Sequence, residues 1–292
     1  MKDQRILVTG ASSGIGRELA RQLAARGALV GIAARREDRL RDLADEIEAA
    51  GGSRPSILPA DLSRPGGASD LAARALAELG AVDVLVNNAG TSLHGLQWIA
   101  GAGEEARELF ETNYWAPLAL TRALVPSMRE RGSGAVVNVT SMIQVAPFPG
   151  LGHACSSKAA LGIASQALRM ELAGSGVRVI EAPLGVIDTA GSYENRRLPG
   201  AERWMKGGPI GTAAEAARRI VSALETGQDR VIYPKRLAVG YALPGLARHY
   251  AARFARHAEP DESILRRTGS TGDPAQREAR AEWEQRRAAL SE

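Results

Sequence analysis

The chain has very little cysteine: Cys155 is the only one among 292 residues. A single cysteine cannot form an internal disulfide, which excludes a disulfide-stabilised scaffold and fits a reducing compartment. The sequence also lacks an apolar run of about 20 residues without charges, the length that a membrane-spanning helix needs. No apolar run with a cleavage site follows Met1. We therefore expect a cytoplasmic protein without signal peptide or membrane span.

A concentration of one charge sign is missing as well. The net charge is +4, and the 37 lysines and arginines are spread among 33 acidic residues. Such mixing is typical of solvated helix faces, so we expect a small-molecule substrate and no nucleic acid partner. No Cys, His and Asp cluster has metal-ligand spacing, which predicts no catalytic metal.

Short apolar runs alternate with longer amphipathic stretches along the first 235 residues. The strand-like runs are Ile6–Val8, Leu29–Ala33, Val82–Val86, Gly134–Val139 and Val177–Glu181, with Val231–Tyr233 as a candidate for a last strand. The helix-like stretches are Arg17–Arg26, Glu37–Ala50, Gly67–Leu79, Glu104–Arg131, Ser156–Ala173 and Ala213–Leu224. This alternation predicts an α/β fold, a doubly wound parallel sheet of the Rossmann type with helices on both faces, as one domain over residues 1–235.

The character of the chain changes after Tyr233. From Leu237 to His257 apolar residues recur among arginines, which predicts a basic amphipathic helix. Such a helix packs on its own domain or a partner subunit, or docks on a membrane surface, and the pattern leaves these open. A short helix is expected near 274–290, within a charged tail. We assign residues 236–292 to a C-terminal helical extension and tail.

A glycine-rich turn follows the first strand. Ile6–Val8 leads into Thr9–Gly16 and then into a helix, a place where backbone amides and the helix dipole favour a pyrophosphate. Gly10 would allow the tight turn, Gly14 the approach of the phosphates, and Gly16 the packing of helix on strand. The turn therefore predicts a dinucleotide site.

The end of the second strand indicates which dinucleotide. An NAD site places an acid there to hold the ribose 2′-hydroxyl, whereas arginine accommodates a 2′-phosphate. Here Arg35 and Arg36 come first, and no acid occurs before Glu37. With Ser12 or Ser13 nearby, the pattern predicts NADP(H).

These motifs, in this order, resemble the short-chain dehydrogenase/reductase family across roughly residues 4 to 235. The turn Thr9–Gly16 matches the family's TGxxxGxG element. The resemblance implies cofactor contacts from Gly10, Ser12, Ser13, Gly14, Ile15, Gly16, Arg35, Arg36, Asp61, Leu62, Asn88, Ala89, Gly90, Lys158, Gly185, Ile187 and Thr189. In this reading Asp61 holds the adenine, and Thr189 meets the nicotinamide carboxamide.

The resemblance also implies catalytic roles. Asn113 matches the helix asparagine that positions a relay water, Ser141 the catalytic serine, and Lys158 the lysine that binds the nicotinamide ribose. The family's general acid/base is a tyrosine four residues before that lysine, where this chain has Ala154. Ser141 lies thirteen residues before Ala154, as the family pattern requires, and no tyrosine occurs between Trp115 and Ser192.

Three explanations of the missing tyrosine stay open. In the first explanation, the chain is a Tyr-to-Ala knockout of an ordinary reductase, which the retained Asn113, Ser141 and Lys158 favour. Alternatively it is a natural variant with another proton donor, either His153 or a water held by those three residues. His153 points about 100° around the helix from position 154. As a third possibility, the fold binds cofactor but performs non-redox chemistry, as a cyclase or lyase, or acts as a sensor. Cys155 fits a buried structural thiol better than a nucleophile.

The substrate pocket is expected outside the carboxyl ends of the strands, between residues 91–94, 142–145 and a lid over 191–208. The candidate substrate contacts are Ser141, Ile143, His94, Tyr193 and Trp204, although His94 also fits an ordinary loop histidine. The mixed apolar and basic lining predicts a medium-sized apolar or polyketide-like carbonyl or alcohol, handled by a ketoreductase or alcohol-dehydrogenase type of enzyme. Small residues after Lys158, together with the resemblance, predict a homodimer or homotetramer built on that helix.

Overall fold

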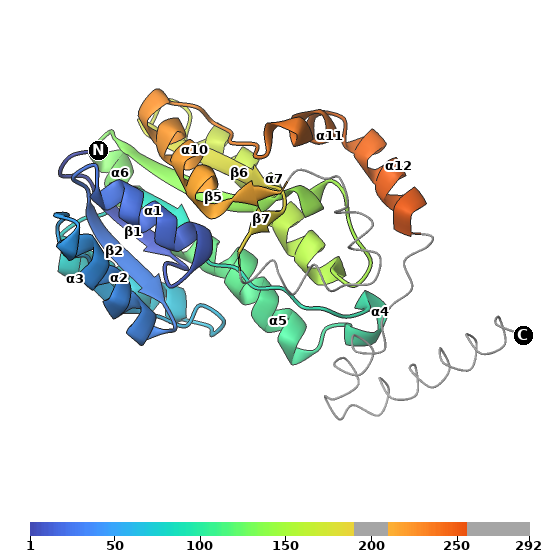
Figure 1. Cartoon of the computed structure of the whole chain (residues 1–292), viewed down its shortest axis with the longest axis horizontal. Coiled ribbons are helices and arrows are strands. Elements are labelled where there is room, and N and C mark those ends of the chain that lie inside the picture. The colour runs from blue at the N-terminus through green and yellow to red at the C-terminus, as the bar shows by residue number, and fades with distance from the viewer. Residues whose placement is uncertain (190–209, 256–292) are drawn as a thin grey trace, which may run out of the picture.

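The computed structural model describes residues 1–189 and 210–255 of the chain. Within them, parallel strands form one sheet in the order β3-β2-β1-β4-β5-β6 (Figure 1). The strands are β1 (Arg5–Thr9), β2 (Leu29–Ala34), β3 (Ser56–Pro59), β4 (Val84–Asn87), β5 (Gly134–Ser141) and β6 (Val177–Leu184). The chain winds outward from β1 to β3 and then returns to β4 on the other side of β1. This order confirms the predicted Rossmann-type fold.

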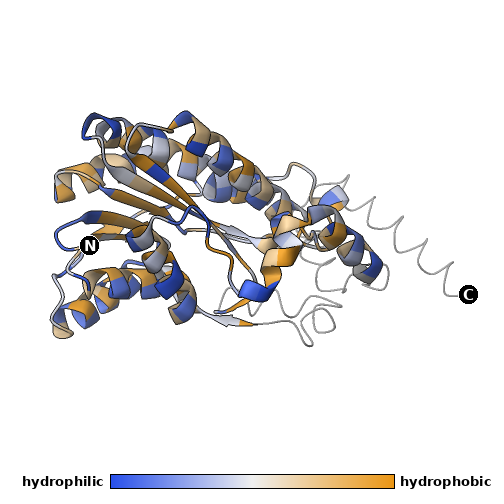
Figure 2. Ribbon diagram, turned by 90° about the horizontal axis from the view of Figure 1, so that it is seen from above, coloured by the Kyte–Doolittle hydropathy of each residue, from blue (hydrophilic) through white to orange (hydrophobic). Residues whose placement is uncertain are grey.

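Helices cover both faces of the sheet, and their apolar sides face inward (Figure 2). One face packs against α1 (Gly14–Ala24), α2 (Glu37–Ala49) and α10 (Ala213–Thr226), and the other against α3 (Gly67–Leu79), α6 (Ala116–Glu130) and α7 (Gly152–Glu171). Alternation along β1 explains the two cores, because Ile6 and Val8 belong to one and Leu7 to the other. Among the described residues, no helix is long and apolar enough to cross a bilayer.

The helical stretch predicted over Glu104–Arg131 contains a π-helical turn. It consists of α5 (Glu104–Phe110), the π-turn η1 (Glu111–Trp115) and α6. A π-turn adds one residue to a helix, changes the direction of the side chains that follow, and frequently marks a functional site. Asn113 lies in this turn and is buried.

The C-terminal prediction of one helix over Leu237–His257 is wrong. The described part contains the short turn η3 (Lys235–Leu237), then α11 (Ala238–Ala242) and α12 (Pro244–Ala255). The chain leaves helical geometry at Leu243, with φ −120° and ψ 68°. Pro244 has no N–H and disfavours the helical region for the residue before it, so the break occurs there.

Some other strand predictions also need correction. The strand β3 was not predicted. The candidate strand Val231–Tyr233 is not a regular strand. Instead, Arg230 and Tyr233 each form an isolated bridge to β6. Two short strands, β7 (Ile187–Asp188) and β8 (Gly211–Thr212), form a separate pair. The small elements α4 (Gln97–Ala100) and η2 (Met142–Gln144) were likewise not predicted. The helix expected near 274–290 lies outside the described residues.

Replacement of Gly16 should test the packing of α1 on the first turn. A Cβ at Gly16 would lie 2.3 Å from the Gly10 carbonyl oxygen, a distance that forces the backbone apart. We expect Gly16→Ala to lower the free energy of unfolding by about 1–3 kcal/mol, measured by urea denaturation. Gly245→Ala is the control, because a Cβ there meets nothing within 4 Å. Equal stability of the two variants would contradict this account.

Candidate functional site

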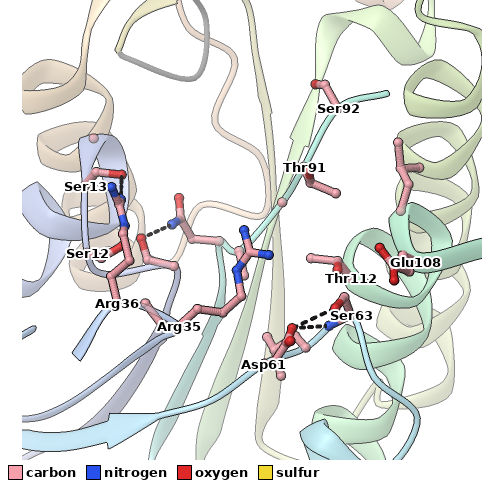
Figure 3. A pocket seen from close by; sticks show the side chains of 18 of the residues that line it. Ser12, Ser13, Arg35, Arg36, Asp61, Ser63, Thr91, Ser92, Glu108 and Thr112 are labelled. Atoms are coloured by element: carbon pink, nitrogen blue, oxygen red, sulfur yellow. Dashed lines mark hydrogen bonds between the residues drawn. The ribbon is translucent and has the colours of Figure 1, made fainter. Parts of the chain in front are cut away.

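A cavity of about 790 Å³ lies at the carboxyl ends of the strands, where the strand order reverses. Its walls come from the turn after β1, the end of β2, the segment after β3, the turn after β4, and α5 with η1 (Figure 3). In open parallel sheets ligands bind at this place, because the loops diverge there. The cavity therefore coincides with the predicted dinucleotide site.

The turn after β1 is joined to the turn after β4. Gly10 has φ +69°, and a Cβ on it would lie 2.8 Å from Ala89 Cα. The Thr9 hydroxyl donates to the Val86 carbonyl at 3.1 Å and accepts from the backbone N–H groups of Asn88 at 3.0 Å and Ala89 at 3.1 Å. Glycine is required because the two turns are in contact, and this contact shapes the floor of the cavity.

The two arginines at the end of β2 lie differently. The Arg36 guanidinium donates from Nη2 to the hydroxyl oxygens of Ser12 at 3.0 Å and Ser13 at 3.1 Å, whereas Arg35 extends into the cavity toward Asp61 (Figure 3). Both arginines are exposed and line the cavity. A guanidinium beside two hydroxyl groups forms a compact group of donors, which suits an anion with several oxygens.

Asp61 follows β3 and lies on the cavity wall. Burial raises the pKa of the Asp61 carboxyl, but hydrogen bonds from Ser63 and the charges of Arg35 and Arg64 outweigh burial and leave the pKa below its ordinary value. The Ser63 hydroxyl donates at 2.7 Å and its backbone N–H at 3.0 Å to the same carboxylate oxygen. Asp61 is therefore ionised at neutral pH and held in one orientation.

Lys158 extends from α7 to the end of the sheet. Its Nζ donates to the Val139 carbonyl on β5 at 3.0 Å, and burial lowers the pKa of the ammonium to about 8. A Cβ at Gly90 would lie 3.2 Å from this Nζ and 3.4 Å from Asn113 Oδ1. The turn after β4, the π-turn and α7 therefore meet closely at Gly90.

The Asn113 side chain connects these segments. Its Oδ1 accepts from the Thr91 N–H at 2.8 Å, and its Nδ2 donates to the Thr91 carbonyl at 2.9 Å and to Ser157 Oγ at 3.0 Å. Both amide hydrogens are thus used within the protein. The side chain fixes the turn after β4 against α7, and the water-positioning role expected from the resemblance stays a prediction.

Ser141 and Ala154 stand on either side of the segment between β5 and α7. Ser141 ends β5, and its Oγ accepts from the Ile143 N–H at 3.4 Å. Ala154 lies on α7 four residues before Lys158 and is 2% exposed. One helical turn separates Ala154 from Lys158, so both residues lie on the same side of α7. A methyl group at position 154 has no proton to exchange.

The two residues that flank Ala154, His153 and Cys155, are both buried. The His153 ring is buried, and its Nε2 lies 2.7 Å from the Gly101 carbonyl oxygen. Since a carbonyl only accepts, this nitrogen carries the hydrogen and is engaged in holding α4 against α7. Burial raises the pKa of the Cys155 thiol, which keeps it protonated and a poor nucleophile.

The remaining predicted residues are partly gathered at the cavity. The wall residues include Ser12, Ser13, Gly14, Ile15, Leu62, Asn88, Ala89, Gly90, His94 and Thr189. The wall does not include Gly16, Ile143, Gly185 and Ile187, nor the predicted catalytic residues Asn113, Ser141, Ala154 and Lys158. Ile143 lies in η2, the turn that follows Ser141. Tyr193, Trp204 and the lid over 191–208 lie outside the described residues.

Sequence reasoning missed one wall of the cavity. Glu105, Glu108 and Thr112 line it from α5 and the π-turn (Figure 3). They follow one another at intervals of three and four residues, and that helical periodicity was the available signal. Among the residues that the structure describes, no group of three His, Cys, Asp or Glu side chains is placed to hold a metal ion.

The low pKa of Lys158 is directly measurable. Carbon NMR of the lysine Cε atoms should contain one resonance that titrates with a midpoint at about pH 8 and that disappears in Lys158→Met. The ammonium would then be charged below this pH and neutral above it. A midpoint near the ordinary value of 10.5 for the same resonance would show that Lys158 is not buried as described.

Comparison with known proteins agrees with the geometry. A family model described as short chain dehydrogenase matches residues 4–198. The short chain dehydrogenase MYCFIDRAFT_6125 of Pseudocercospora fijiensis is 40% identical over 200 residues, which cover 65% of this chain and 64% of that protein. The chain thus matches slightly less than two thirds of that relative's length.

Solved structures share the fold. A short-chain dehydrogenase from Sphingobium yanoikuyae in complex with NADPH has a TM-score of 0.72 and 27% identity, covering 89% of this chain and 99% of that one. A short chain dehydrogenase/reductase from Burkholderia phymatum in complex with NAD has a TM-score of 0.74 over 89% and 98% of the two chains, at 23% identity, which speaks for the fold alone. The family model, the relative and the strand order together show that the chain belongs to the short-chain dehydrogenase/reductase family.

Proposed function

We propose that the chain is an NADP(H)-dependent oxidoreductase of the ketoreductase or alcohol-dehydrogenase type whose proton-donor position is occupied by Ala154. The observation that carries this proposal is the close approach of Lys158 and Asn113 to Gly90, which lines the cavity. Lys158 lies one helical turn from Ala154. A buried cation next to a cavity at the carboxyl ends of the strands supports the proposal. The substrate that we propose is a medium-sized apolar carbonyl compound or the corresponding alcohol.

The residues present fit a dinucleotide. The cavity is large enough for one, glycine at position 10 and the N-terminus of α1 leave backbone N–H groups accessible, and no acidic side chain precedes Arg35 at the end of β2. In this proposal Arg36, with Ser12 and Ser13, holds the 2′-phosphate, and Arg35 adds a second positive charge. Lys158 donates to the nicotinamide ribose. When bound, NADP(H) supplies a hydride to the substrate carbon or accepts one from it.

Carbonyl reduction also requires a proton on the substrate oxygen, and the chain must supply it. Ser141 has a hydroxyl that can donate to that oxygen, and the Lys158 ammonium is protonated at neutral pH. A phenol at position 154 would lie one turn from this cation, which would favour its ionised form. Loss of a general acid costs about 10²–10⁴-fold in rate, so we infer intact cofactor binding with little turnover.

Self-association through α7 stays a prediction. Ile163 and Met170 on this helix are exposed, at 66% and 73%, and offer apolar contact area. Two of the small residues behind the prediction, Gly162 and Ser165, are instead buried on the chain's own sheet side. The apolar pair therefore supports the prediction better than the small residues do.

The cofactor preference should depend on Arg36. NADPH should bind more tightly than NADH, and Arg36→Ala should weaken NADPH about 10- to 100-fold, the worth of hydrogen bonds to a charged phosphate, with little effect on NADH. Fluorescence titration of both nucleotides measures this. Arg39→Ala is the matched control, since Arg39 on α2 is exposed and pairs with Asp38 and Asp42 in the described part of the chain. Equal affinities of the parent for the two nucleotides would refute the NADP(H) assignment.

Restoring the phenol should restore turnover. Ala154→Tyr should raise NADPH consumption with a panel of apolar ketones by about 100-fold or more. The same substitution combined with Lys158→Met should lose most of this gain, because the phenol pKa would no longer be lowered. If Ala154→Tyr folds and binds NADPH but leaves every ketone unreduced, the oxidoreductase proposal fails in favour of non-redox chemistry or a sensor role.

A natural enzyme with a different donor would behave in another way. The parent chain would then reduce ketones at a substantial rate, and Ala154→Tyr would add little. The buried His153, bonded to the Gly101 carbonyl, argues against its use as that donor. Activity of the parent that survives His153→Ala but not Ser141→Ala would identify the water held by the remaining site residues.

A further inference from the structure

A carboxylate is buried outside the cavity. Glu181 lies on β6 with 0% of its surface exposed. Along this strand Ile180, Ala182 and Leu184 belong to the core beneath α10, so alternation directs the Glu181 side chain to the α7 face of the sheet. A buried charge is costly unless hydrogen bonds and an opposite charge compensate it. The partners of Glu181 therefore indicate what the residue does.

The carboxylate is held by four side chains from separate segments. Its Oε1 accepts from Thr140 Oγ1 at 3.1 Å and from Gln144 Nε2 at 3.0 Å. Its Oε2 accepts from the Tyr241 hydroxyl at 2.8 Å and lies 3.5 Å from Arg230 Nε. The strand β5, the turn η2, the helix α11 and the segment after α10 thus converge on one side chain.

Two of these partners flank Ser141. Thr140 precedes it on β5, and Gln144 closes the turn that follows it. Gln144 Nε2 also lies 3.2 Å from Thr140 Oγ1, so both ends of the five-residue segment are fixed to the same carboxylate oxygen. Backbone bonds from Val145 and Ala146 to the Met142 carbonyl complete the turn. The position of Ser141 therefore depends on Glu181.

The helix α7 leaves room for this arrangement at Gly162. A Cβ at Gly162 would lie 2.0 Å from Gln144 Oε1 and 3.3 Å from Glu181 Oε1. Gly162 is four residues after Lys158 on the same helix. The glycine thus accommodates the Gln144 side chain rather than a partner helix, and it brings the Glu181 cluster to within one helical turn of the lysine.

The other two partners belong to the C-terminal part of the described chain. Burial, with the Glu181 charge, raises the pKa of the Tyr241 phenol to about 12, so the phenol stays protonated and donates. The Arg230 guanidinium lies 4.8 Å from the centre of the Tyr241 ring, a cation–π contact. Nearby, Leu237 Cδ1 occupies the space where Gly185 would carry a Cβ. The segment Lys235–Ala242 is thus packed against the site region.

We propose that Glu181 is a positioning residue, which couples the docking of Lys235–Ala242, through Tyr241, to the position of Ser141 and the turn Met142–Gln144. The coupling itself stands on the contacts above, and its consequence for the reaction rests on the function proposed for Ser141. Loss of the Tyr241 hydroxyl leaves Oε2 with a single, exposed cation, and the carboxylate is then free to leave Gln144. The turn loosens although no residue in it has changed.

Hydrogen–deuterium exchange tests the coupling without any assay of activity. In Tyr241→Phe the backbone amides of Ile143, Val145 and Ala146 should exchange about tenfold faster than in the parent, the factor that corresponds to one hydrogen bond to a charged group. Tyr250→Phe is the matched control, because Tyr250 on α12 is 60% exposed. Glu181→Gln should reproduce the effect, since its amide has one acceptor oxygen where the carboxylate has two, and so cannot accept from Gln144 and Tyr241 at opposite ends. Unchanged exchange in the turn in both site variants would overturn the proposal.

Kinetics in the Ala154→Tyr background test the consequence. There Tyr241→Phe should lower kcat about tenfold, because Ser141 is misplaced, and leave the Kd for NADPH unchanged. A kcat equal to that of Ala154→Tyr alone would refute the positioning role. If Ala154→Tyr itself is inactive, the proposed function has failed, while the exchange experiment still decides whether the coupling exists.

Discussion

The site depends on the close approach of the strand ends. Gly10, Gly16 and Gly90 each lie where a Cβ would meet another segment, at 2.8 Å, 2.3 Å and 3.2 Å respectively. Because no side chain intervenes, the turns after β1 and β4 touch, and Lys158 reaches the end of β5 from α7. The first residues of α1, Gly14 and Ile15, line the same cavity. A binding site and a buried cation therefore arise from one packing constraint.

Lys158 is costly to keep buried, whereas position 154, one helical turn away, carries only a methyl group. Burial opposes the charge of the ammonium and lowers its pKa to about 8, so the lysine is hard to explain by stability alone, whereas tyrosine is tolerated on many helices. This imbalance is why we propose a reductase without its proton donor rather than an unrelated binding protein. It also explains why cofactor binding and turnover should respond separately to substitution.

How far the sequence predicts the structure differs from one feature to another. The glycine turn and Arg35 with Arg36 were predicted at the cavity because each belongs to a short motif at a strand end, whereas Lys158 was expected only from the family resemblance. The strand β3 was missed, since Ser56–Pro59 is short, ends in proline and only Leu58 is fully buried. The π-turn around Asn113 was missed because one added residue leaves the apolar pattern nearly unchanged. Proline at position 244 was a sufficient signal for the helix break, and the prediction overlooked it.

The Glu181 cluster could not be predicted from local patterns. Its partners Thr140, Gln144 and Tyr241 are 41, 37 and 60 residues away in the chain, and each contact exists only once β5, η2 and α11 are in place. A glutamate within a strand otherwise looks like an ordinary polar position. Long-range contacts of this kind depend on the fold, and the motifs around the cavity do not contain them.

We expect this chain, with Ala154 unchanged, to bind NADP(H) in the cavity beside Lys158. A crystal structure of the unaltered chain grown with saturating NADPH is the direct test. It should contain density for the nucleotide along the glycine turn, with the 2′-phosphate against Arg36 and the hydroxyls of Ser12 and Ser13. An empty cavity, or a bound nucleotide whose 2′-phosphate lies away from both Arg35 and Arg36, would contradict it.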